Sequence, residues 1–144
     1  MRSALALLAL NLALGCGPVP GGALRGTPAP QPPDWSGALG GDRALCEVES
    51  RPEDVHSIQL ECFLVDGQLY AQSHRWALAD WWPTKSWAAI WLEHPAVRVR
   101  IGERLYLLRA ARVTDPALRE PILRERGYDP VPDGIVLFRF EPRA

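Results

Sequence analysis

The strongest constraint on the fold is a set of short runs in which apolar and polar residues alternate with the period of a β-strand. The clearest run is VRVRI at 97–101, where valine and isoleucine alternate with arginine. Turn signals at 66–67 and 102–103 separate neighbouring runs at hairpin spacing, which predicts mostly antiparallel pairing. Six strands are expected, at 44–50, 58–65, 68–73, 97–101, 105–113 and 135–140.

Two other segments carry the signals of helices. Across 85–94, apolar residues recur at positions i, i+3, i+4 and i+7; Thr84 is expected to cap this helix, and a proline ends the run. A second helix is expected over 116–126, capped by Thr114 or Asp115 and kinked or split by Pro121. The chain is therefore expected to be mainly β with two helices (α+β). Closure into a small six-stranded antiparallel barrel would hide the strand edges.

The first 15 residues are expected to be a secretory signal peptide. Arg2 precedes an apolar run at 4–14, which is shorter than the roughly 20 residues that a membrane span needs. The tetrapeptide ALGC at 13–16 resembles the lipobox of bacterial lipoproteins, with its leucine and small residue transposed. This resemblance implies cleavage after Gly15 and lipid attachment at Cys16. An ordinary signal peptide and a short buried helix are the alternatives.

Proline, glycine and alanine dominate the next segment, 17–42. Such a composition buries little apolar surface, so 16–42 is expected to be a lipid-bearing, extended tether in front of a folded domain at 43–144. Gly17 replaces the aspartate that retains enteric lipoproteins in the inner membrane. By that resemblance, we expect an exported protein held by its lipid on the periplasmic face of the outer membrane.

Charge and cysteine content limit the partners. A net charge of −1 gives no broad basic field for nucleic acid.

Cys46 and Cys62 are an even pair in an exported domain, which suggests a disulfide. They would lie opposite each other if their hairpin loop centres near Asp54. Two buried thiols are the alternative, and no metal site is expected.

Arginines 98, 100, 109 and 112 should point outward. They would form either a solvated face or a contact for anionic lipid or envelope polymer.

Four stretches carry a resemblance to known proteins: VDGQLYAQS at 65–73, KSWAAIWLEHPAVRVRIG at 85–102, LYLLRAARVTDP at 105–116 and IVLFRFEP at 135–142. They are similar to the split-barrel flavin-binding proteins, which comprise the pyridoxamine-phosphate-oxidase-like group and its deazaflavin-dependent nitroreductase relatives. The shared features are a Trp-bearing helix that ends at a proline, two strands after it, and a helix behind an acidic cap. The resemblance implies a split barrel that can form a homodimer.

The resemblance also implies a phosphate site for FMN or a deazaflavin just before the Trp-bearing helix. The matching residues are Thr84, Lys85 and Ser86, followed by Trp87, and Lys85 is the sole lysine of the chain. His74 could line the mouth of a pocket here. A cluster of tryptophans could stack on a flat ring: Trp76, Trp81, Trp82, Trp87 and Trp91. The alternatives are a solvent-facing lysine, a surface histidine and tryptophans that pack in the core. No catalytic residue is predicted.

One loop departs from the family pattern. The loop at 51–57 carries Glu53 and Asp54, which repel a phosphate, where the nitroreductase relatives have glycine, arginine and serine. Export of an unfolded chain also separates the protein from cytosolic cofactors. We therefore expect a lipid-anchored binding or structural module with an unknown ligand. The alternatives are a flavin- or deazaflavin-dependent oxidoreductase and a carrier of a small ligand such as haem or lipid.

Overall fold

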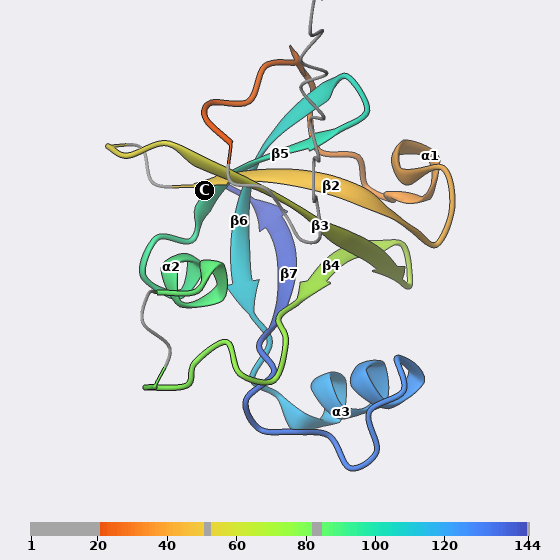
Figure 1. Cartoon of the computed structure of the whole chain (residues 1–144). Helices are drawn as coiled ribbons and strands as arrows, with labels where there is room; N and C mark the ends of the chain where they lie inside the picture. Colours follow the sequence, from red (N-terminus) through yellow and green to blue (C-terminus); the bar gives the residue numbers. More distant parts are fainter. Residues whose placement is uncertain (1–20, 51–52, 82–84, 144) are drawn as a thin grey trace, which may run out of the picture.

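A computed structural model describes residues 21–50, 53–81 and 85–143. Six antiparallel strands close into a barrel in the order β2-β3-β4-β7-β6-β5, because β5 pairs with β2 and β6 pairs with β7 (Figure 1). The predicted mainly β, six-stranded antiparallel barrel is confirmed. The strands are β2 (Arg43–Ser50), β3 (His56–Val65), β4 (Gln68–Gln72), β5 (Ala96–Ile101), β6 (Arg104–Arg112) and β7 (Leu137–Pro142), and a short β1 (Thr27–Pro28) runs parallel to the start of β6.

The alternation seen in the sequence sorts side chains between the inside and the outside of the barrel. On β5, Val97 and Val99 are fully buried, while Arg98 and Arg100, which alternate with them, are half-buried on the outer surface. Phe138 and Phe140 of β7 fill the same interior. The barrel is therefore closed around a packed apolar core.

Within the described residues, three helices accompany the barrel, one more than predicted: α1 (Ser36–Leu39), α2 (Trp87–Glu93) and α3 (Pro116–Glu125). Ser86 caps α2, and Thr84, the predicted cap, lies outside the described residues. Asp115 caps α3, which runs through Pro121 without being split. Pro121 is exposed, and the burial of Ile122 and Leu123 beside it offsets the lost backbone hydrogen bond. None of the described helices is long and apolar enough to cross a membrane.

A second apolar cluster lies between α3 and the outer face of the barrel. Ile122 and Leu123 of α3 pack there with Phe63, Tyr70 and Leu137 from β3, β4 and β7. At the end of the helix, the guanidinium of Arg126 lies 3.8 Å from the centre of the Phe63 ring. Helix α3 is thus held on the barrel by apolar burial and by this cation–π contact.

The N-terminal strap, defined as residues 21–35, crosses the outside of the barrel. It begins at Gly21, which exchanges two backbone hydrogen bonds with Ser57 of β3, at 2.7 and 2.9 Å. Farther along, the backbone N–H of Leu24 donates to the carboxylate of Glu49 at 2.5 Å. The same carboxylate pairs with Arg98 at 3.0 Å and is itself buried. The strap is therefore tied across β3, β2 and β5 by backbone and charged contacts.

The strap ends in the core of the molecule. Its last residue, Trp35, is fully buried, and its ring meets Tyr106 edge-on with centroids 4.8 Å apart. The backbone N–H of Trp35 donates to the carbonyl of Gly67 at 2.9 Å. The extended tether expected over 16–42 therefore differs from the structure from Gly21 onward. Trp35 and Leu39 supply apolar burial that the average composition of the segment conceals.

The strand directions define two ends of the barrel. The entry end carries the start of the strap at Gly21, residues 53–55 of the loop before β3, and residues 74–81 of the connection that follows β4. The turn end carries α1 and the turns at 66–67 and 102–103. In Figure 1 the entry end lies toward the left, with α2, and the turn end toward the right, with α1. The strap runs from the entry end to the turn end.

Replacing Trp35 by alanine should destabilise the protein strongly. Removal of a fully buried tryptophan leaves a cavity, and we expect a loss of about 3–5 kcal/mol in the free energy of unfolding. Trp76→Ala, at an exposed tryptophan, is the matched control and should change it by about 0.5 kcal/mol or less. Urea unfolding followed by circular dichroism measures both. Equal, small losses would show that the strap does not belong to the folded unit.

Candidate functional site

The lysine of the predicted phosphate site forms an ion pair with the last residue of α2. Lys85 Nζ donates to both carboxylate oxygens of Glu93, at 2.5 and 2.6 Å. Both side chains are about half exposed. A phosphate at this position would have to compete with the carboxylate for the ammonium group.

The next two residues, Ser86 and Trp87, cap the start of α2 and pack on its buried face. Ser86 Oγ accepts from the backbone N–H of Ala89 at 3.2 Å and donates to the carbonyl of Ala77 at 2.5 Å. Trp87 packs against Trp91, with ring centroids 4.5 Å apart, and its ring centroid lies 6.0 Å from that of Phe138. The hydroxyl and the indole are therefore engaged in capping and in core packing.

The remaining predicted residues lie on the connection from β4 to α2. His74 is exposed, and its Nδ1 accepts from the backbone N–H of Trp76 at 3.2 Å. Thr84 and Trp82 lie outside the described residues. His74, Lys85, Ser86 and Trp87 are each engaged by other protein groups in the described part of the chain, so the phosphate site stays a prediction.

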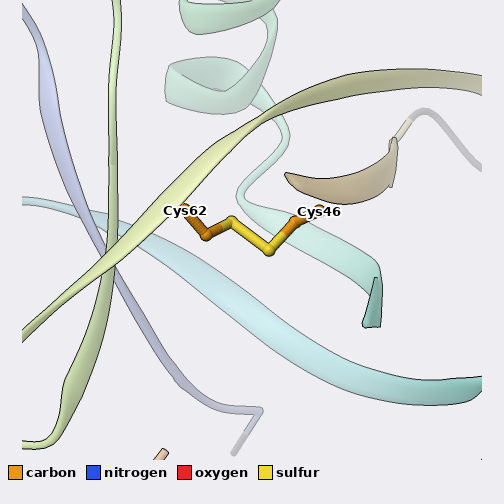
Figure 2. The surroundings of a disulfide bond; sticks show 2 residues. All are labelled: Cys46 and Cys62. Atoms are coloured by element: carbon orange, nitrogen blue, oxygen red, sulfur yellow. A yellow bond between two sulfur atoms is a disulfide. The ribbon is translucent and has the colours of Figure 1, made fainter. Parts of the chain in front are cut away.

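The two cysteines of the barrel form a disulfide, Cys46–Cys62, between β2 and β3 (Figure 2). Cys46 faces Leu60 and Ala44 faces Cys62, so the cysteines lie two residues apart in register. The expectation that they lie directly opposite each other is wrong. The register between β2 and β3 differs from the one expected for a loop centred on Asp54, so Cys46 pairs with Leu60 rather than with Cys62. Their Cα atoms are 5.9 Å apart, within the usual range for a disulfide, and both residues are fully buried.

A cavity of about 650 Å³ lies at the turn end, between the strap and the hairpin of β5 and β6. Its size lies in the range of small-molecule sites, whereas cavities of about 200 and 140 Å³ elsewhere are below it. The strap and α1 supply one wall and the hairpin supplies the other. The lining residues are Thr27, Pro30, Pro32, Asp34, Gly37, Ala38, Ile101, Glu103, Arg104 and Tyr106.

Charges of both signs line this cavity. The pKa of Asp34 is lowered by hydrogen bonds from the side chain and backbone of Ser36, with the backbone N–H donating at 2.7 Å. Asp34 is therefore ionised at neutral pH. Its stabilising contribution is present above the ordinary aspartate pKa and is lost as the pH falls through the lowered value. Glu103 adds a second carboxylate and Arg104 a guanidinium, so the lining presents two negative groups and one positive group.

The outward arginines expected to form a basic strip are mostly paired with carboxylates. Arg98 pairs with Glu49, and Arg100 pairs with Glu47. Arg109 lies 3.7 Å from a carboxylate oxygen of Glu141. The strip is therefore largely neutralised. Within the described residues, no group of three or more histidine, cysteine or acidic side chains could hold a metal ion.

No protein-family model matches the chain, and no curated protein matches it. The resemblance to split-barrel flavin-binding proteins therefore stays a prediction. The cavity was missed in the sequence because one of its walls belongs to the segment interpreted as a tether. Trp35 and Leu39 were the available signal, since large apolar residues are unusual in a solvated linker.

Lys85→Ala should leave any FMN interaction unchanged and lower stability only slightly. The variant removes an exposed ion pair, so we expect a loss of about 1 kcal/mol or less in the free energy of unfolding. Arg124→Ala, which removes the exposed pair with Glu120, is the matched control. Titration of FMN fluorescence measures binding. FMN binding by the wild type that Lys85→Ala abolishes would establish the phosphate site predicted from the sequence.

Proposed function

We propose that the chain is a lipid-anchored protein of the bacterial cell envelope whose barrel is a small-molecule binding module. The disulfide Cys46–Cys62 is the observation that carries the location, because such bonds persist mainly in oxidising compartments. It accounts for two of the three cysteines, and the third, Cys16, stands at the end of the apolar N-terminal run. This arrangement supports export of the chain and attachment of lipid at Cys16.

The cavity at the turn end supports the binding role. Pro30 and Pro32 offer apolar surface beside the buried Tyr106, while Asp34 and Arg104 offer opposite charges. Such a lining complements a small molecule that carries both an ammonium and a carboxylate group, as amino acids and short peptides do. The contacts of Lys85 and Ser86 lend no support to the oxidoreductase alternative.

Mature protein made from the full precursor in a bacterial host should begin at Cys16 and carry lipid. Intact mass measurement gives the N-terminus and the added acyl mass, and Cys16→Ser should release the protein from membranes. The double variant Ala13→Leu with Leu14→Ala restores the usual lipobox order and should be processed at least as completely. If Cys16→Ser stays membrane-bound, the lipid attachment is refuted.

Binding in the cavity should raise the melting temperature. We would screen amino acids and dipeptides by thermal unfolding, where a compound at ten times its Kd stabilises by about 1.4 kcal/mol. Arg104→Ala, at the start of β6, should remove the shift, and Arg112→Ala, at the other end of the same strand, should retain it. The ligand class proposed here is wrong if none of these compounds shifts the wild type, or if Arg104→Ala keeps the shift.

A further inference from the structure

We propose that the entry end of the barrel docks on the bilayer, with the loop at 74–81 lying in the membrane interface. This inference rests on the proposed lipid at Cys16. It adds an orientation: one defined end of the barrel faces the lipid, and the cavity at the turn end faces away from it. Two independent observations carry it, one from chain length and one from exposed apolar surface.

The first observation is the short distance between anchor and barrel. Gly21 is fixed to Ser57 near the start of β3 by two backbone hydrogen bonds. Five Cα–Cα steps separate Cys16 from Gly21, so the spacer spans at most about 18 Å. The ten residues of β3 extend over about 33 Å, nearly twice that length. A lipid on Cys16 therefore keeps the entry end close to the membrane surface.

The second observation is the distribution of exposed apolar side chains. Six large apolar residues are exposed in the part of the chain that the structure describes. Trp76 and Trp81 are 54% and 65% exposed, and both lie on the entry-end connection together with Leu78. Val55, in the loop before β3, is exposed at the same end. The two exceptions, Leu45 and Leu107, lie on the outer faces of strands.

The chemistry of this end suits the membrane interface. Tryptophan concentrates at the level of lipid headgroups, where an apolar ring with a polar N–H is most stable. The rings of Trp76 and Trp81 lie 6.2 Å apart, and the guanidinium of Arg75 lies 6.0 Å from the Trp76 ring, where it can meet lipid phosphate. Glu53 and Asp54 offset this positive charge, so the contact should depend on apolar insertion rather than on anionic lipid.

The docking can be tested whether or not cells attach lipid to Cys16. Protein beginning at Cys16 retains every described residue, and its disulfide leaves the Cys16 thiol for coupling to a maleimide lipid in vesicles. Vesicles of phosphatidylcholine with brominated acyl chains then report insertion by quenching tryptophan emission. Failure of natural lipid attachment would be seen separately, in the mass of the mature protein.

We expect brominated vesicles to quench wild-type emission, with the same loss when a fraction of anionic lipid is added. Val55→Asp with Leu78→Asp places charges at the entry end, keeps every tryptophan, and should abolish the quenching. Leu45→Asp with Leu107→Asp makes the same changes on the strand faces and should retain it. The inference is overturned if wild-type emission is not quenched, if quenching requires anionic lipid, or if the entry-end variant is quenched like the wild type.

Discussion

The buried carboxylate of Glu49 holds the strap in place, and the other features of the molecule depend on the position of the strap. Glu49 is 7% exposed, and it is balanced by Arg98 and by the backbone N–H of Leu24. A buried carboxylate is costly unless it is paired and hydrogen-bonded, so the strap and β5 are needed to satisfy it. Because one carboxylate binds both partners, the N-terminal segment is part of the folded body.

The fixed strap links properties that otherwise look unrelated. At its start, Gly21 sets the distance between Cys16 and the barrel. At its end, Trp35 completes the core beside Tyr106. Between them, Thr27 and Pro30 form one wall of the cavity. A flexible tether of the same length would provide neither the wall nor the orientation, since its ordering would not be compensated by burial.

The sequence predicts the strands well because their signal is local. Apolar and polar residues alternate with a period of two in each run. The turns at 66–67 and 102–103 fix the pairing of β3 with β4 and of β5 with β6. The fit of β1 against β6 and the burial of Trp35 depend on partners far along the chain, and composition averages hide them. The predicted phosphate site shows the same limit, because Lys85 and Glu93 are brought together only when α2 forms.

The charge pattern decides how such a barrel can meet a membrane. The sequence predicts outward arginines on β5 and β6, either as a solvated face or as a contact for anionic lipid. Arg98 and Arg100 instead meet carboxylates of β2, and both also donate to backbone carbonyls of the strap. Arg98 and Arg100 therefore hold β5 to β2 and to the strap, so little unbalanced charge remains on the outer face of β5. In the proposed docking, the apolar side chains at the entry end are therefore the stronger attraction to lipid, and the turn end with its cavity faces the solvent.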